Sequence, residues 1–322
     1  MTHTDLLSPA FRALSARLGQ DPLQVQGPGG NTSVKGDGVM WIKASGTELA
    51  EAETKEIFVA VDLAAARAEA EGAGDGTCKA AVLDPGVTLR PSIETTFHAV
   101  LDWPVVMHTH SVATLTHAIS PQGCAAAADR LAGLPVAFVP YRKPGLPLTR
   151  EILTHIGPDT RVIVLRNHGL ICCGETVEDT GDLIATVEAR LALPPADLSG
   201  PVPGDAPEGR HWVPSATRLG ADPRLFRLVR AGSYYPDHVV FLGPALPVAD
   251  PDDGRPAILV EGQGMLMRED ATAAQRAMLD CLVAVLSRLP EDWRADPIGP
   301  EAEAELLNWD AEKYRMALAR GG

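Results

Sequence analysis

The amino-acid sequence predicts an α/β protein. Short apolar segments typical of strands, such as 57–61 and 162–166, alternate with amphipathic or alanine-rich segments typical of helices, such as 176–193. Apolar residues make up 45% of the 322 residues, which is enough for a full hydrophobic core and excludes a disordered chain. A stretch rich in proline, glycine, aspartate and serine at 194–209 predicts a linker between two parts.

The part before the linker contains most of the predicted elements. A helix over 5–19 carries an apolar stripe that ends at Gly19, and a glycine-rich turn follows over 27–33. Strands are predicted near 39–43 and over 57–61, and an alanine- and glutamate-rich helix and a flexible loop over 72–78 come next. The remaining elements are a helix over 92–102, a strand over 105–110, two short helices, a strand over 136–139, a helix over 149–157, strands over 162–166 and 170–173, and a helix over about 176–193.

The part after the linker, 210–322, repeats a pattern of the first part. A strand, a polar turn, a glycine, a second strand and a long helix begin at Val162 and again at Ala257, 95 residues later. Residues 225–242 likewise resemble 93–108. We interpret the C-terminal part as a degenerate partial repeat without metal ligands, because Gln263 stands where His168 stands and Leu242 where His108 stands. The alternative is the general similarity of strand–turn–helix units in α/β proteins.

Composition excludes several classes of partner. The net charge of −14 argues against nucleic acid and against an anionic membrane surface. No apolar run reaches 18 residues, so we expect no membrane span, and the first residues lack the pattern of a signal peptide. The five cysteines are scattered without a C-x-x-C pattern, which is typical of reduced thiols in a cytoplasmic protein.

A cluster of metal-ligating residue types is predicted around one strand. His108 and His110 lie two residues apart on the strand over 105–110, so both side chains point to the same face. Glu94 lies at the start of the preceding helix, and His168 ends the strand over 162–166. Three imidazoles with an open fourth position are the usual form of a catalytic zinc site, and a nearby carboxylate can supply the proton transfer.

Two glycine-containing turns predict an anion-binding site. Gly29 and Gly30 allow backbone N–H groups to approach an anion closely, and Asn31 adds an amide donor. Ser45 and Gly46 form a second small turn rich in donors. The alternative for the first turn is an ordinary chain reversal, and Lys35 and Lys43 nearby could equally face solvent.

Five short motifs occur in a characteristic order. They are Gly-Gly-Asn-Thr-Ser at 29–33, Lys-Ala-Ser-Gly-Thr at 43–47, Pro-Ser-Ile-Glu at 91–94, His-Thr-His at 108–110 and Asn-His-Gly at 167–169. Together they resemble the class II aldolase/adducin family over residues 5–193. The segments at 236–244 and 261–265 are similar to the rhamnulose-phosphate-aldolase-like branch, here without the dehydrogenase domain that is fused to some members.

The resemblance implies a fold and an assembly. The expected fold is a three-layer α/β/α class II aldolase-like domain over 1–193, with a mixed, largely antiparallel central sheet, and a C-terminal α/β lobe over 210–322. The family forms tetramers with the active site between subunits, so we expect a homotetramer or another homo-oligomer.

The resemblance also implies an activity, that of a metal-dependent lyase. It would cleave a ketose 1-phosphate into dihydroxyacetone phosphate and an aldehyde through a metal-stabilised enediolate. Glu94 would be the catalytic proton carrier, and zinc or another divalent metal would be bound by His108, His110 and His168. The expected phosphate-binding residues are Gly30, Asn31, Lys43, Ser45, Gly46 and Ser92.

The sequence departs from the family pattern at two points. Ile93 follows Ser92 where phosphate-using relatives have a second serine, and no tyrosine occurs between His110 and Arg130 to serve as the proton donor to the aldehyde. Tyr141, Tyr234 or Tyr235 could supply that tyrosine. The alternatives are therefore a decarboxylase, dehydratase or epimerase acting on a sugar (acid) phosphate, and a non-enzymatic adducin-like binding module. We expect His98 to serve packing rather than to orient Glu94, and His117 to lie on the surface.

Overall fold

The computed structural model describes residues 6–248, 254–310 and 312–314. Their contacts divide them into two compact units. The first unit comprises the described residues up to Leu115 together with Ala127–Ala192, and the second comprises Thr116–Ala126 together with the described residues from Leu193 onward. Residues 116–126 thus group with the second unit rather than with the part over 1–193 in which the sequence places them. The roles assigned to these parts stay predictions.

A seven-stranded sheet forms the centre of the first unit, in the order β3-β2-β1-β4-β7-β6-β5. Neighbouring strands are antiparallel except β5 and β6, which are parallel. The strands are β1 Asn31–Gly36, β2 Val39–Lys43, β3 Phe58–Asp62, β4 Val105–Thr109, β5 Val136–Val139, β6 Val162–Leu165 and β7 Gly169–Gly174. The sheet is therefore mixed and largely antiparallel, as the sequence predicts.

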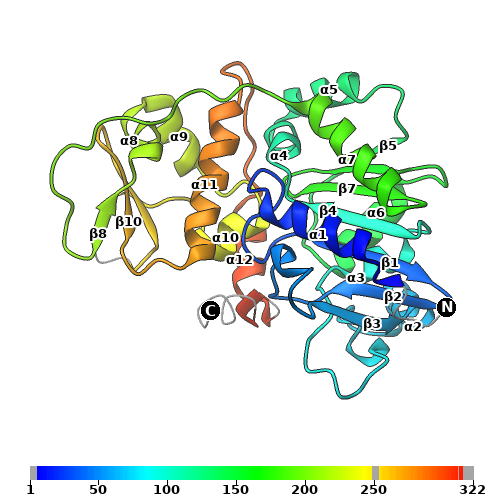
Figure 1. Ribbon diagram of the computed structural model, residues 1–322. Helices are drawn as coiled ribbons and strands as arrows, with labels where there is room; N and C mark the ends of the chain where they lie inside the picture. Colours follow the sequence, from blue (N-terminus) through cyan, green and yellow to red (C-terminus); the bar gives the residue numbers. More distant parts are fainter. Residues whose placement is uncertain (1–5, 249–253, 311, 315–322) are drawn as a thin grey trace. The chain divides into compact units, whose positions relative to one another are not determined.

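Helices cover both faces of this sheet, which gives three layers (Figure 1). On one face, α1 Pro9–Gln20 packs against α7 Val177–Leu191. On the other face, α3 Thr95–Val100 packs against α2 Leu63–Ala68 and α6 Leu146–His155. The helices α4 Val112–Ala118 and α5 Pro121–Arg130 connect β4 to β5.

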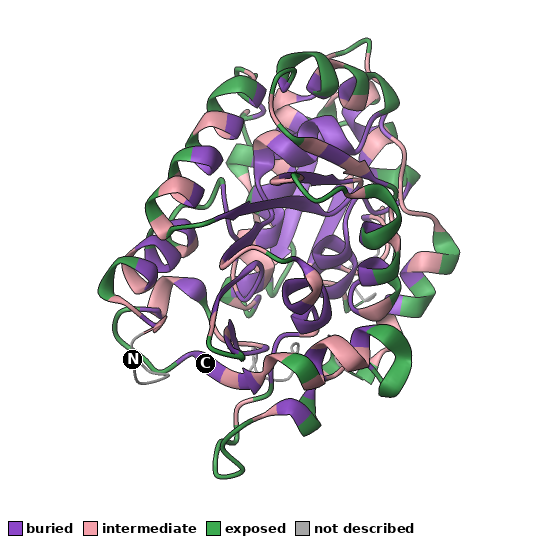
Figure 2. Ribbon diagram, turned by 90° about the vertical axis from the view of Figure 1, so that its right-hand side faces the viewer, coloured by how far each residue is buried: buried purple, intermediate pink, exposed green. Residues whose placement is uncertain are grey.

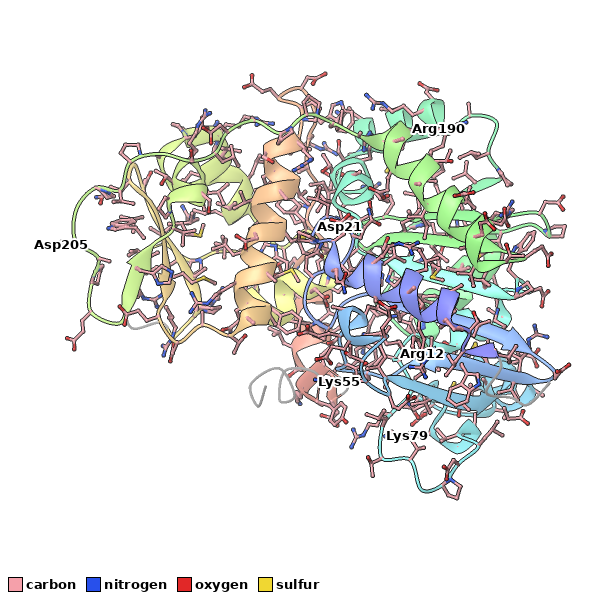
Figure 3. All side chains as sticks on the ribbon, in the orientation of Figure 1. Arg12, Asp21, Lys55, Lys79, Arg190 and Asp205 are labelled. Atoms are coloured by element: carbon pink, nitrogen blue, oxygen red, sulfur yellow. The ribbon has the colours of Figure 1, made fainter. Side chains whose placement is uncertain are left out.

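Apolar side chains of the central strands fill the space between the layers, and the strands are buried along most of their length (Figure 2). Phe97 of α3 packs with Val106 of β4 and with Ile152 of α6 in one apolar cluster on the α3 face. Charged side chains lie on the periphery, as the exposed Lys79 and Arg190 do in Figure 3. Some polar side chains are nevertheless buried, among them Lys35, Lys43 and Glu94, and buried polar groups need partners.

Most of the predicted elements are present within a few residues of their predicted bounds. The N-terminal helix begins at Pro9, where the Ser8 side chain accepts a hydrogen bond from the Phe11 amide, and residue 5 of the prediction lies outside the described residues. The main omission is β1, because the sequence predicts only a turn over 27–33. Segment 194–209, the predicted linker, contains neither helix nor strand.

The second unit contains a three-stranded antiparallel sheet with the order β8-β10-β9. Its strands are β8 Arg210–Trp212, β9 Ala257–Val260 and β10 Gly264–Arg268. Its helices are α8 Thr217–Ala221, α9 Pro223–Ala231, α10 Pro236–Leu242, α11 Ala273–Arg288 and α12 Pro300–Leu307.

His117 belongs to this unit and is fully buried, with its ring centroid 5.1 Å from that of Trp293, so the predicted surface position is wrong.

One part of the predicted repeat has a structural counterpart, and another does not. The hairpins β6–β7 and β9–β10 have the same register, since Leu165 pairs with Gly169 and Val260 pairs with Gly264. Each hairpin is followed by a long helix whose first turn is capped by a threonine side chain. Residues 236–242, in contrast, form helix α10 and not a strand like β4, so their resemblance to 102–108 is wrong.

Among the described residues, no helix is long and apolar enough to cross a membrane.

Candidate metal centre and its carboxylate

Three histidines meet at one end of the central sheet. His108 lies in β4, His110 lies just beyond the end of that strand, and His168 lies in the turn between β6 and β7. Because β4 and β7 run antiparallel, the end of β4 lies beside the start of β7. One ligating nitrogen from each histidine lies within 4.8 Å of the others, and all three side chains are buried. The structure therefore brings together the three residues that the sequence singles out.

A glycine allows the two strand ends to approach this closely. A side chain at Gly169 would place its Cβ 2.3 Å from the carbonyl oxygen of Thr109, a distance that no Cβ tolerates. The preceding residue, Asn167, has a positive φ of 54° and so turns the chain sharply after β6. This tight turn places His168 beside the other two histidines.

The tautomer of a neutral His108 ring follows from its surroundings. Its Nδ1 lies 3.0 Å from the carbonyl oxygen of Leu170. A carbonyl can only accept, so Nδ1 carries the hydrogen and, in the neutral ring, Nε2 carries the lone pair. A backbone carbonyl that fixes one ring nitrogen in this way is typical of metal-ligating histidines. Nε2 is therefore the candidate ligand atom.

Glu94 lies beside this cluster as the residue that begins α3. Its Oε2 lies 3.5 Å from Nε2 of His108, and its Oε1 lies 3.3 Å from Nε2 of His168. Burial raises the pKa of Glu94, but the histidines His108 and His168 and the hydrogen bond from Asn31 together bring the pKa below its usual value. The carboxylate is thus held in its charged, proton-accepting form.

These residues fit a divalent cation. Nε2 of His108 faces a carboxylate oxygen, and this pair needs a positive charge: either a proton on the ring, which is the charge that lowers the pKa of Glu94, or a cation beside them. Oε1 of Glu94 is buried and accepts no hydrogen bond from the residues that the structure describes. Three imidazoles from strand ends would leave a further coordination position for a substrate oxygen.

Asn31 links the carboxylate to a second buried histidine. Its side-chain Nδ2 donates a 2.8 Å hydrogen bond to Glu94 Oε2, and its Oδ1 is hydrogen-bonded to Nε2 of His98. Nδ1 of His98 lies 2.7 Å from Oγ of Ser33. The prediction that His98 only packs is therefore incomplete: its ring stacks on Phe97, with centroids 4.6 Å apart, and also makes two hydrogen bonds. Ser33 has no part in the sequence prediction.

The glycine-rich turn precedes β1 directly and lies next to the histidines. Gly30 has a positive φ of 58°, and a Cβ there would lie 2.9 Å from the carbonyl oxygen of His108. Lys43 Nζ donates hydrogen bonds of 2.9 and 3.1 Å to the carbonyl oxygens of Pro28 and Gly30. Lys43 is therefore buried under the turn and stabilises its shape, so any attraction it exerts on a phosphate acts from below the turn.

The second predicted turn lies beside Ser92. Ser45 donates its backbone N–H to the carbonyl oxygen of Arg90, and Ser92 donates its own to that of Lys43, so the two segments run side by side. Gly46 has a positive φ of 81°. The Ser92 hydroxyl accepts a 3.2 Å hydrogen bond from the Glu94 amide, which ties this segment to the start of α3. The phosphate-binding role of these residues stays a prediction.

The tyrosines divide between the two units. Tyr141 lies in the loop that follows β5, at the same end of the sheet as the histidines, because β5 runs parallel to β6. Tyr234 and Tyr235 belong to the second unit and are buried, and burial raises the pKa of both hydroxyls. Tyr234 donates its hydroxyl to the carbonyl oxygen of Leu228.

Similarity to known proteins covers most of the first unit and residues 116–126 of the second. The Class II Aldolase and Adducin N-terminal domain matches residues 12–193. The N-terminal class II aldolase domain of a conserved protein from Thermoplasma acidophilum is 28% identical, with a TM-score of 0.52 over 59% of this chain and 93% of that one. This likeness supports the three-layer fold.

Two curated proteins match shorter stretches. An uncharacterized oxidoreductase of Bacillus subtilis (strain 168), YuxG, is 29% identical over 180 residues, which are 50% of this chain and 25% of that protein. The protein hu-li tai shao of Drosophila melanogaster is 34% identical over 92 residues, which are 20% of this chain and 8% of that protein. The matched residues thus span a quarter or less of either relative. With the domain match extending over more than half of its residues, the chain belongs to the class II aldolase and adducin family.

Proposed function

We propose that the protein is a divalent-metal-dependent aldolase that cleaves a ketose 1-phosphate into dihydroxyacetone phosphate and an aldehyde. The observation that carries this proposal is the contact of one buried carboxylate, Glu94, with two of three clustered histidines. A lyase needs a proton carrier next to the group that polarises the substrate carbonyl, and this arrangement supplies both.

A divalent cation, zinc in our proposal, would be held by His108, His110 and His168 and would polarise the ketone of the substrate. The protein's own part is the movement of a proton. When the bond between C3 and C4 breaks, the electron pair stays on C3, and Glu94 accepts the proton of the C4 hydroxyl as the aldehyde forms. Glu94 then delivers this proton to C3, the carbon that keeps the electron pair. Burial of the carboxylate excludes water from this step.

The phosphate of the substrate would bind at the two turns beside the cluster. Gly30 and Gly46 both have positive φ, which shapes narrow turns that expose backbone N–H groups. The hydroxyls of Ser45 and Ser92 would add donors, and Lys43 beneath the first turn would add positive charge. We expect the protein to act as a homo-oligomer in the cytoplasm.

Metal content of the purified full-length protein tests the first half of this proposal. We expect about one zinc ion per chain, because three histidines with an open fourth position are the usual form of a catalytic zinc site. We expect His110→Ala to lose this ion. His155→Ala is the matched control, because His155 lies on α6 at the surface, and its polar interactions among the described residues are with Glu151 and Thr154. Absence of metal after incubation with zinc, manganese or cobalt would refute the proposal and favour an adducin-like binding module.

Release of an aldehyde from a panel of ketose 1-phosphates tests the second half. We expect activity with at least one of them and a loss of about 100-fold or more in Glu94→Gln, which keeps the size of the side chain but cannot carry the proton. Loss of carbon dioxide or water, or inversion at one carbon, would instead assign the protein to the decarboxylase, dehydratase or epimerase alternative.

A further inference from the structure

Strand β1 and helix α3 face each other through polar side chains, not apolar ones. Asn31 and Ser33 alternate along β1 and so share one face of the sheet. Glu94 and His98 are four residues apart at the start of α3 and share one side of the helix. All four side chains are buried, and at most 5% of each residue is exposed. Buried polar groups are costly unless they are paired, so this arrangement needs a reason.

The direction of each hydrogen bond in this group follows from the orientation of the Asn31 amide. Its Nδ2 faces Oε2 of Glu94 at 2.8 Å, and an amide nitrogen can only donate. The Asn31 oxygen then faces His98, and Nε2 of His98 must carry the hydrogen. In the neutral ring Nδ1 accepts, so the Ser33 hydroxyl donates to it. A single consistent chain of donors runs from Ser33 to Glu94.

The environment of His98 keeps its ring neutral, as this chain requires. Complete burial is the main cause, and the nearby Lys35 adds to it; together with His108 they hold the pKa of His98 well below its usual value. The ring is also fixed in orientation, because it stacks on Phe97. His98 therefore has one tautomer and one position available.

We propose that His98, held in the Nε2–H tautomer by Ser33, is a positioning residue that fixes the Asn31 amide and, through it, the carboxylate of Glu94. This inference rests on the proposed function, because it assigns Glu94 the proton transfer. If the Asn31 amide turned over, its oxygen would face the carboxylate and repel it. A carboxylate displaced by a fraction of its contact distance would then be out of reach of the reacting carbon.

The tautomer of His98 can be measured without any substrate or metal. In full-length protein labelled with ¹⁵N at histidine, the ring whose signals are missing from His98→Gln is that of His98, and we expect its Nε2 to be protonated and its Nδ1 not. We expect Ser33→Ala to shift the Nδ1 signal of the same ring. A ring protonated at Nδ1, or a ring that exchanges between both tautomers, would overturn the proposal, because Asn31 would then have no fixed orientation.

Solvent hydrogen exchange into dihydroxyacetone phosphate, with the zinc-loaded protein, tests the effect on proton transfer. Glutamine places its amide nitrogen near the position of Nε2, and asparagine places its own near that of Nδ1. We therefore expect His98→Gln to keep kcat within about 3-fold and His98→Asn to lower it by about 10-fold or more, with little change in KM. Equal values for the two variants, or an effect on KM alone, would overturn the proposal.

A control on the other side of α3 separates positioning from general damage to the helix. Thr96 makes a buried 2.7 Å hydrogen bond to Thr149. Neither threonine belongs to the chain of hydrogen bonds that runs from Ser33 to Glu94. We expect Thr96→Val to reduce stability but to keep kcat; a fall equal to that of His98→Asn would show a merely structural role. If the unsubstituted protein exchanges no hydrogen, the proposed function fails for this substrate, while the ¹⁵N signals still decide the geometry of His98.

Discussion

Lys35 and Leu101 are joined by a hydrogen bond between a side-chain amine on β1 and a main-chain carbonyl at the end of α3. The same amine donates a 2.9 Å hydrogen bond to the carbonyl oxygen of Trp103. Lys35 thus satisfies the carbonyl group of the residue that caps α3 and a second carbonyl group in the segment that follows the helix. Lys35 lies on the same face of β1 as Asn31 and Ser33. This face therefore contacts the beginning of α3 through Asn31, its middle through Ser33 and its C-terminal end through Lys35.

The buried amine of Lys35 predicts a specific dependence of stability on pH. Burial lowers its pKa from 10.5 to about 7. Between these two values the unfolded chain binds a proton that the folded chain does not, so the free energy of unfolding rises as the pH rises through this range. From roughly pH 7.5 to 9 we expect a gain of about 2 kcal/mol in the original protein relative to Lys35→Met, measured by urea unfolding. Parallel curves for the two proteins would contradict this prediction.

Gly30 should tolerate alanine less well than Gly38. Both have positive φ, 58° and 79°, so alanine is strained at both positions. At Gly30 the added Cβ would also lie 2.9 Å from the carbonyl oxygen of His108 and from Cγ2 of Val25, whereas Gly38 has no atom within 4 Å. We expect Gly30→Ala to lower the free energy of unfolding by about 1–3 kcal/mol more than Gly38→Ala. Equal losses in urea unfolding would mean that the turn shifts freely.

The other face of β1 also carries a polar pair. Oγ of Ser15 on α1 and Oγ1 of Thr32 lie 2.8 Å apart, and both residues are fully buried. Replacing either one, as Ser15→Ala or Thr32→Val, leaves a buried hydroxyl without its partner, so we expect each to cost about 1–3 kcal/mol. The double variant should cost clearly less than the sum of the two, as a double-mutant cycle by urea unfolding would show. Additive losses would mean that the two hydroxyls are not coupled.

Divalent metal should stabilise the folded protein through the three histidines. At a free zinc concentration about 100 times the dissociation constant, we expect the free energy of unfolding to rise by about 2.7 kcal/mol, with a higher Tm in a thermal scan. A chelator should reverse this gain. His168→Ala should show neither effect, whereas His155→Ala should behave like the original protein. A gain of equal size in His168→Ala would place the metal elsewhere.

The sequence predicts the elements whose apolar pattern is plain, and it predicts the three histidines because strand periodicity places His108 and His110 on one face. Strand β5 is predicted to the residue, and β2 lies where the sequence predicts a strand near 39–43. Strand β1 is missed because Thr32 faces α1 while Asn31 and Ser33 face α3, so polar residues lie on both sides and no alternation of hydrophobicity appears. The polar residues Asn31 and Ser33 that hide β1 in the sequence are also the hydrogen-bonding partners of His98 that the sequence prediction lacks. Only the three-dimensional structure shows that Thr32 finds its partner on α1 while Asn31 and Ser33 find theirs on α3.

The pairing of β1 with β4 has a consequence for the order of events during folding. β1, β2 and β3 can form a meander from local contacts, and β4 must find β1 across a long intervening chain, with Asn31 directly opposite His108 in the register. Pairings between distant segments form slowly, since the chain between them must first be closed into a loop. The three histidines, in contrast, come from β4 and the β6–β7 hairpin, so a refolding molecule can acquire its metal-binding competence once β4 meets β7, before β1 joins. Uptake of a metal would then report, in real time, the pairing of β4 with β7.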